Sequence, residues 1–162
     1  MNRRHFLAML TFSTLAGCGF HLPGGSTIPQ SLAGLQVQST GPAGGLLASA
    51  VERALERDGN HSSASGPVLR LENIRIDQRA ISISPSSGAA LEFLNTLRGQ
   101  ISVEQGQKIL LPPAPLLVEQ SFTYNSANPL ATNVQQAENQ RQLVEEAAQE
   151  VLRRVLLSPR FG

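Results

Sequence analysis

Three long strand-like segments follow one another between residues 68 and 124, and only turn signals separate them. The connection from Ser84 to Gly88 is rich in serine, and the one from Gln105 to Lys108 contains a glycine. Antiparallel strands can be joined by such tight turns, whereas parallel strands need a crossover of about a dozen residues or more. The chain is therefore predicted to form an antiparallel meander on which any helices must pack.

The first strand segment, Val68 to Ser84, cannot present all its apolar side chains on one face. Leu69 and Leu71 occupy odd positions, whereas the isoleucines at 74 and 76 occupy even ones. Side chains of a regular strand alternate between the two faces, so a change of phase requires an extra residue. We expect a bulge or a bend within this strand.

The second segment keeps one phase throughout and is the clearest strand pattern of the chain. Its apolar residues on one face are Leu91, Phe93, Leu97, Ile101 and Val103. The third segment runs to Tyr124 and contains prolines at 112, 113 and 115. Proline cannot donate to the ladder and belongs at edges or bulges, so we expect these prolines to interrupt the return strand.

Two amphipathic helices are predicted, one before the meander in the sequence and one after it. In the first, from Leu47 to Arg57, apolar residues recur at i, i+3 and i+4, and Gly59 can supply a left-handed cap. The second has an apolar stripe from Ala137 to Leu156 and a candidate cap at Thr132 or Asn133.

A short alternating stretch at Leu35 to Gln38 precedes the first helix and predicts one more strand. The order is then strand, helix, three strands, helix. Each helix has one apolar stripe to bury, so both must cover the same sheet. We expect an α/β (α+β) two-layer sandwich with one four-stranded, mostly antiparallel sheet and two helices packed on one face.

The N-terminus has the features of an export signal. Arg3 and Arg4 precede an uncharged apolar stretch from Phe6 to Leu15, which is shorter than the ~20 residues of a membrane-spanning helix. The stretch ends in Leu15-Ala16-Gly17-Cys18, which resembles the lipobox cut by lipoprotein signal peptidase. We therefore predict cleavage before Cys18.

Cys18 is the only cysteine of the chain, so it cannot form an internal disulfide. A leftover thiol in an exported protein needs an explanation, and a small buried thiol is the alternative to lipidation. The position of Cys18 favours lipidation. We expect it to carry a diacylglycerol and an N-acyl chain such as palmitate, because two or three acyl chains anchor a protein stably to a bilayer.

This interpretation divides the chain into a cleaved signal peptide at 1–17, a lipidated cysteine and tether at 18–34, and one domain at 35–162. Cleavage would leave 145 residues with 11 basic and 12 acidic groups, because Arg3 and Arg4 leave with the signal. A formal charge of −1 is unlike that of a nucleic-acid-binding protein.

No catalytic or metal-binding pattern stands out in the expected mature chain. His21 and His61 have no partners at metal-ligand or triad spacing, and the serines at 86 and 87 lack a nucleophile elbow. The glycines from Gly41 to Gly45 precede a helix but lack the ending of a phosphate loop, so we interpret them as a flexible lead into it. Binding is favoured over catalysis, and no metal or cofactor is expected.

The run Cys18-Gly19-Phe20-His21-Leu22 resembles the start of the LptE family of lipopolysaccharide-assembly lipoproteins. The order of the elements is similar across nearly the whole expected mature chain. The Asn128-Pro129-Leu130-Ala131 turn and the terminal helix, with Glu146-Ala147-Ala148 before Arg153-Arg154, agree as well.

The resemblance implies a non-enzymatic subunit that plugs the β-barrel LptD, helps it to assemble and takes part in passing lipopolysaccharide to the surface of a Gram-negative cell. Gly19, in place of the aspartate that signals inner-membrane retention, implies the periplasmic face of the outer membrane. An alternative is a lipid-binding or transporter-accessory periplasmic lipoprotein, since a mostly aliphatic core could open between sheet and helices.

In the family, basic residues in loops at one end of the sheet are associated with lipopolysaccharide, plausibly through its phosphates. The corresponding loops here, 84–88 and 125–133, contain no arginine or lysine. Arg79 and Arg98 are the nearest basic residues and are therefore the candidate lipopolysaccharide contacts. Either could instead be a solvated residue of a strand.

Overall fold

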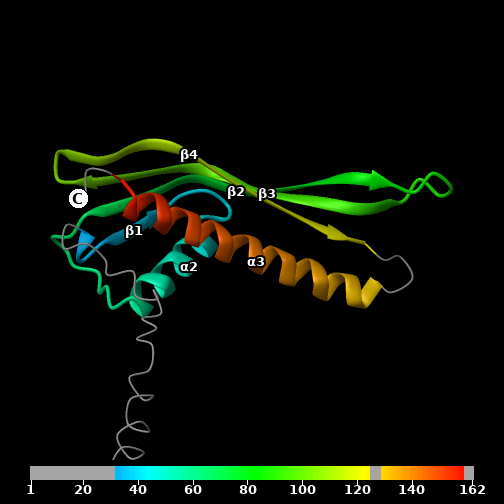
Figure 1. Ribbon diagram of the computed structural model, residues 1–162, viewed down its shortest axis with the longest axis horizontal. Coiled ribbons are helices and arrows are strands. Elements are labelled where there is room, and N and C mark those ends of the chain that lie inside the picture. The colour runs from blue at the N-terminus through cyan, green and yellow to red at the C-terminus, as the bar shows by residue number, and fades with distance from the viewer. Residues whose placement is uncertain (1–31, 125–128, 159–162) are drawn as a thin grey trace, which may run out of the picture.

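The computed structural model describes residues 32–124 and 129–158. The predicted signal peptide, the predicted lipidation site Cys18 and nearly all of the predicted tether lie outside these residues. The described elements are one sheet and two long helices (Figure 1).

The sheet contains β1 (Gln36–Ser39), β2 (Val68–Ile83), β3 (Ala90–Gln105) and β4 (Lys108–Thr123), in that spatial order. β1 pairs parallel with β2, and the other two pairs are antiparallel. The connection between β1 and β2 contains a helix, as a parallel pair requires. The predicted meander and the predicted element order are confirmed.

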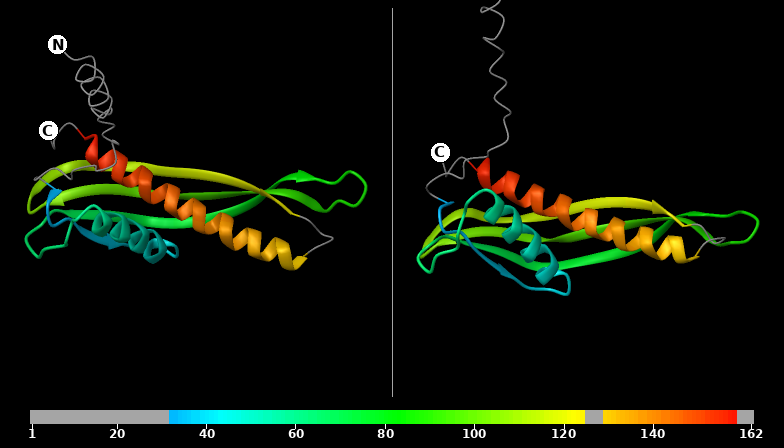
Figure 2. Two further views of the ribbon diagram at one scale, coloured as in Figure 1. Left: turned by 60° about the horizontal axis from the view of Figure 1, so that its bottom comes forward. Right: turned by 90° about the horizontal axis from the view of Figure 1, so that it is seen from below.

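Two helices, α2 (Gly44–Arg57) and α3 (Pro129–Leu156), cover the same face of the sheet (Figures 1 and 2). α2 packs on β1 and β2, whereas α3 crosses β3 and β4 diagonally and also contacts α2. No helix of the described residues covers the opposite face, which we call the helix-free face. The predicted two-layer sandwich is confirmed.

The bulge expected in β2 lies between Glu72 and Arg75, where the register with β3 shifts. Asn73 has φ 54° there, in the left-handed region that asparagine tolerates better than most residues. The extra residue returns Ile74 to the core face after Leu71, and both side chains are fully buried. This explains the phase change in the sequence.

The prolines of β4 do not interrupt it as expected. β4 is continuous, and its register with β3 shifts between the pairs Ile101–Ala114 and Val103–Leu111. β4 is an edge strand, so a missing N–H on its outer side costs no ladder bond. The expectation of an interruption was wrong, while the rule that places proline at edges and bulges holds.

The start of α3 also differs from the prediction, because the helix begins at Pro129 rather than after a cap at Thr132 or Asn133. Proline suits the first helical position, where its missing N–H has no intrahelical partner to lose. Thr132 lies inside the helix and is buried. By contrast, α2 ends as expected: Gly59 has φ 79° and donates its N–H to the Glu56 carbonyl, which forms part of a left-handed cap.

The apolar core lies under the half of the sheet that α2 covers. Its fully buried members include Leu47, Val51, Leu69, Leu71, Ile74, Leu97, Ile101, Val103, Leu116, Leu143 and Val151. The other half of the sheet extends beyond β1 and α2 as a long β2–β3 hairpin (Figure 1). We call the half that α2 covers proximal and the half that extends beyond α2 distal.

Under the N-terminal half of α3 the contact with the sheet is polar. Asn95 of β3 donates through Nδ2 to Oδ1 of Asn139 in α3 at 2.7 Å, and Asn139 Nδ2 donates to the Ser121 carbonyl at 3.1 Å. Gln78 of β2 completes the network by donating to Asn95 Oδ1 at 3.0 Å. Asn95 and Asn139 are buried, and their hydrogen bonds fix the position of the helix, since either amide left alone would carry a desolvation cost; Gln78 is exposed.

Candidate functional site

The helix-free face follows from the alternation of the strands. Asn95, Leu97 and Ile101 of β3 point toward the helices, so the residues between them point the other way. These residues and their neighbours on β2 and β4 are largely polar. The set includes Arg70, Arg75, Asp77, Arg79, Thr96, Arg98, Gln100, Glu104 and Glu119.

Asp77 and its neighbours form the main charged cluster of the helix-free face. Arg98 of β3 donates through Nε to Asp77 Oδ2 at 2.6 Å, and Arg75 lies 3.6 Å from the same oxygen. All three side chains are about half exposed, so each pair contributes at most about 1 kcal/mol of stability. Two guanidinium groups share one carboxylate, which leaves the cluster with positive charge.

Arg79, the other candidate from the sequence, lies opposite Leu94 of β3 and is exposed. No hydrogen bond or ion pair engages its guanidinium within the described residues. Arg79 and Arg98 are therefore on one face, but they differ in availability because Arg98 is bound to Asp77. Their assignment as lipopolysaccharide contacts stays a prediction.

A shallow hollow of about 470 Å³ lies beside the charged cluster, over the bulge of β2. Arg75 and Arg98 contribute to its wall, together with Pro115 and Leu117 of β4. Leu117 is 57% exposed although its neighbours Leu116 and Val118 are buried, because it points to the helix-free face. The hollow thus combines guanidinium groups with an exposed apolar side chain.

The end of the distal hairpin carries apolar side chains that the fold does not cover. Ile81, Ile83 and Leu91 are 44%, 61% and 41% exposed. The sequence analysis placed Leu91 on the core face, but the core does not reach this end of the sheet. Nearby, the Phe93 ring stacks on Phe122 with centroids 5.5 Å apart.

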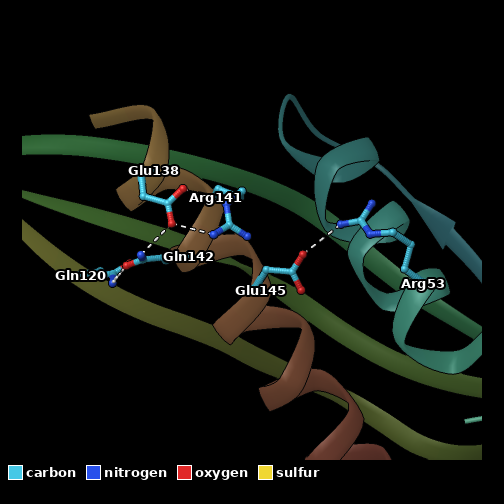
Figure 3. Close-up of polar contacts among 6 residues, drawn as sticks. All are labelled: Arg53, Gln120, Glu138, Arg141, Gln142 and Glu145. Carbon is cyan, nitrogen blue, oxygen red and sulfur yellow. Dashed lines mark hydrogen bonds and ion pairs between the residues drawn. The ribbon is translucent and has the colours of Figure 1, made fainter. Parts of the chain in front are cut away.

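Polar contacts connect α3 to α2 and to β4 (Figure 3). Arg53 of α2 donates to Glu145 at 3.1 Å, and Gln120 of β4 donates to Gln142 at 3.1 Å. The hydrogen bond from Arg141, and a second one from Gln142, lower the pKa of Glu138 from 4.5 to about 2. These groups hold the exposed side of α3 in place, and Arg53, Arg141 and Glu145 also line a hollow of about 300 Å³ between α2 and α3.

A second hollow, about 520 Å³, lies on the helix side where α2 and α3 end. Its wall is mostly apolar and includes Leu32, Leu35, Leu55, Leu152 and Leu156. Its position at the proximal end separates it from the arginines of the helix-free face. It is the feature most relevant to the alternative of a lipid-binding protein.

Within residues 32–124 and 129–158, no three His, Cys, Asp or Glu residues lie together as metal ligands would. Neither helix of the same residues has the length and hydropathy that crossing a membrane would require. His61 is exposed, and the serines at 86 and 87 lie in the turn between β2 and β3.

Asp77 is the member of the charged cluster that the sequence analysis did not single out, because it treated the two aspartates of the expected mature chain as scattered. The pairing of Asp77 with Thr96 brings it next to Arg98, 21 residues away. Counting residues back from the turn along both strands could have suggested that Asp77 pairs with Thr96. The register shifts between Ala80 and Ile83, however, change which residues pair.

Three known proteins are similar to this chain, one in sequence and two in structure. A protein of Photorhabdus laumondii named LPS-assembly lipoprotein LptE is 28% identical over 167 residues, covering 96% of this chain and 87% of that protein. The solution structure of an uncharacterized lipoprotein B from Nitrosomonas europaea has a TM-score of 0.64 at 21% identity, covering 85% of this chain and 90% of that one. A minor lipoprotein from Acinetobacter baumannii has a TM-score of 0.62 at 20% identity, with coverage of 75% and 89%.

At 20% and 21% identity, the similarity to the two solved structures shows the fold alone. Membership of a family is shown by a different finding: the model of a family described as LptE, lipopolysaccharide-assembly, matches residues 32–155. That range includes all four strands, α2, all of α3 except its last residue, and the arginines of the helix-free face. The chain therefore belongs to the LptE family of lipopolysaccharide-assembly lipoproteins.

Proposed function

We propose that this chain is a non-enzymatic lipoprotein that sits as a plug inside an LptD-like barrel, assists assembly of that barrel and takes part in lipopolysaccharide insertion at the cell surface. The helix-free face is the observation that carries the proposal. It spans the length of three long strands, and no element of the described chain covers it.

The chemistry of this face suits the lumen of a barrel. An antiparallel sheet with one solvated face is common, so polarity alone points to no partner. The side chain of Leu117, however, is 57% exposed among these polar groups, as an interface residue would be. The inside of an outer-membrane barrel is polar, and a polar plug with a few apolar contacts would match it.

Attachment to the outer membrane is part of the same proposal. Cys18 would carry a diacylglycerol and an N-acyl chain, and it lies 14 residues before the first described residue, Leu32. The segment between them is rich in glycine, proline, serine and threonine, which suits a tether. The lipid would hold the domain at the periplasmic face, close to a barrel in the same membrane.

Of the two candidate arginines, Arg79 is proposed as the stronger contact with lipopolysaccharide and Arg98 as the weaker one. A phosphate could accept hydrogen bonds from the Arg79 guanidinium without displacing another group. At Arg98 it would have to compete with the carboxylate of Asp77. Arg79→Ala is expected to weaken lipopolysaccharide binding more than Arg98→Ala does.

Co-purification tests the plug role. A tag after Gly162 in the native host, followed by detergent extraction, should recover a large β-barrel protein with the chain. Leu117→Glu should reduce this recovery several-fold, because it places a charge within the contact. Leu46→Glu on α2 is the matched control, since Leu46 is 55% exposed, on the helix side. Recovery of the wild-type chain alone would reject the proposal.

The alternative of a lipid-binding or transporter-accessory lipoprotein is favoured by the apolar hollow at the ends of α2 and α3. Its test is the analysis of lipid that co-purifies with a soluble form lacking Cys18. Stoichiometric lipid that is lost in Leu152→Glu, at the wall of that hollow, would support this function. A lipid-free protein would count against this alternative and in favour of the plug role.

A further inference from the structure

The outer edge of β2 is open over most of its length. β1 covers only the four residues Val68 to Leu71. The turn after β1 extends this cover a little, because Ile74 donates its N–H to the Thr40 carbonyl at 3.0 Å and accepts from the Ala43 N–H at 3.0 Å. Beyond Ile74 no described strand pairs with this edge, and Figure 1 shows the hairpin continuing past β1 and α2.

Three residues of this edge point their backbone groups outward. Both the N–H and the C=O of Ile74 face the outer side, and alternate residues of a strand point to the same side. Arg75 to Ala80 pair with β3 without a register shift, so the alternation continues through them. Ile76, Gln78 and Ala80 therefore present their N–H and C=O groups to the outside.

The opposite edge of the sheet is protected. Pro112, Pro113 and Pro115 remove N–H donors from β4, and Arg154 of α3 donates to the Pro115 carbonyl at 2.5 Å. Asn139 occupies the Ser121 carbonyl in the same way. Exposed edges invite pairing with another chain unless proline, charge or a covering element blocks them. Between Ile76 and Ala80, β2 has no proline and no covering element among the described residues, and its charged side chains, Asp77 and Arg79, both project from the helix-free face rather than across the edge.

We propose that the β2 edge from Arg75 to Ala80 accepts an extended, acidic segment of a partner polypeptide as a fifth strand. The side chains at this edge favour an acidic segment, because Arg75 and Arg98 share the carboxylate of Asp77 and the exposed Arg79 lies two residues further along the same face. The exposed Ile81 and Ile83, at the end of the same strand, offer apolar contacts to the segment.

A second copy of this chain fits the edge less well. An antiparallel pair centred on Gln78 would place Asp77 of each copy opposite Arg79 of the other, which is favourable by itself, but Asp77 is already bound to Arg98. Such a pair would also bring the arginines of both copies together around these two aspartates. An acidic segment relieves this positive charge, whereas a second copy doubles it.

This site goes beyond the proposed plug role and does not depend on it, because the contact is made by backbone groups. It also differs from an anion site at Arg79. A phosphate could reach the guanidinium, but it could not form hydrogen bonds with the N–H groups of Ile76, Gln78 and Ala80 together. Protection of these amides therefore distinguishes a strand from an anion.

The test uses the full-length lipidated chain in detergent micelles and a nine-residue probe peptide of alternating threonine and valine with a central glutamate. Amide exchange is followed by NMR during titration. The peptide is expected to bind with a Kd on the order of 1 mM or tighter and to protect the amides of Ile76, Gln78 and Ala80. A peptide with lysine at its centre should bind about two- to fivefold more weakly, and Arg79→Glu should reverse this preference.

Ala80→Pro removes one outward N–H and should weaken peptide binding about tenfold. Ser121→Pro makes the same change on the outer side of β4 and should leave peptide binding unchanged. Absence of protection at about 5 mM peptide, or equal effects of the two proline variants, would overturn the proposal. Protection that grows with the concentration of the chain alone would show that a second copy occupies the edge, and it would overturn the proposal as well.

Discussion

Gly41 is a single residue on which the contact between α2 and β2 depends. Its φ is +99°, and a Cβ at this position would lie 2.6 Å from the Ile74 nitrogen and 2.9 Å from the Asn73 carbonyl carbon. The sequence analysis interpreted the glycines from 41 to 45 as a flexible lead into the helix. The structure instead places Gly41 tightly against the bulge of β2, a contact that no spacing in the sequence reveals.

Gly41→Ala is expected to lower the free energy of unfolding by about 2 to 4 kcal/mol, because positive φ and a close backbone contact both disfavour a side chain. Urea denaturation followed by circular dichroism measures the change. Gly45→Ala is the control, since nothing lies within 4 Å of a Cβ there. It should leave stability unchanged or raise it by up to about 1 kcal/mol. Equal losses in both variants would contradict this account.

Glu138 makes stability depend on pH in acid. Its folded pKa is about 2, below its ordinary value of 4.5, because Arg141 and Gln142 donate hydrogen bonds to the carboxylate. Between these pH values the unfolded chain binds more protons, so this contribution is complete above pH 4.5 and is lost as the pH falls toward 2. Glu138→Gln should therefore make the melting temperature less dependent on pH in this window.

The control for this experiment is Glu146→Gln, an exposed glutamate of the same helix without an ion pair among the described residues. Melting temperatures at pH 2.5, 3.5 and 4.5 compare the two variants with the wild type. The slope should change in Glu138→Gln only. A wild-type slope in that variant would mean that the ion pair with Arg141 does not persist in solution.

At the scale of elements, α3 consists of two halves with different contacts. The C-terminal half buries Leu143, Ala147, Val151 and Val155 in the apolar core. In the N-terminal half Val134 is 71% exposed, and the buried side chains there include the polar Thr132 and Asn139. The first half is thus held by a few hydrogen bonds, each with a modest net contribution of about 1 kcal/mol.

Amides of residues 133–141 are therefore expected to exchange at least about tenfold faster than those of residues 143–155, because local opening of the first half exposes little apolar surface. Hydrogen exchange measured by mass spectrometry tests this. Asn139→Ala should speed exchange in the first half alone, whereas Val151→Ala should speed it in both. Uniform exchange along α3 would show that the helix opens as one unit.

The sequence predicts these elements unevenly, for physical reasons. The bulge of β2 could be inferred because a change of apolar phase has only a few structural solutions. The start of α3 was placed too late because polar residues at the beginning of a helix carry no periodic apolar signal. The pair of Asp77 with Arg98 was missed because two further register shifts separate it from the turn.

At the scale of the whole molecule, the apolar core is proximal and the polar contacts are distal. The element order fixed the architecture in advance because short turns force antiparallel pairing and each helix has one stripe to bury. The same logic says nothing about which face meets a partner. The proposal of a partner-facing surface required the exposed fractions of Leu117 and the distal isoleucines, and these fractions depend on where the core ends.

Cys18, outside the described residues, provides the last prediction, because lipid and partner would each hold the molecule at the membrane. Cys18→Ala is expected to abolish acylation, which mass spectrometry of the native-host protein measures. At native expression the variant should still co-sediment with membranes through the proposed barrel. When it is overproduced, the excess should be soluble, since one anchor is gone and barrel sites are limited. Wild-type excess should stay with the membrane, because two or three acyl chains suffice for stable anchoring.

An unmodified Cys18 in the wild-type protein would contradict lipidation. A variant that is soluble even at native expression would contradict retention by a barrel.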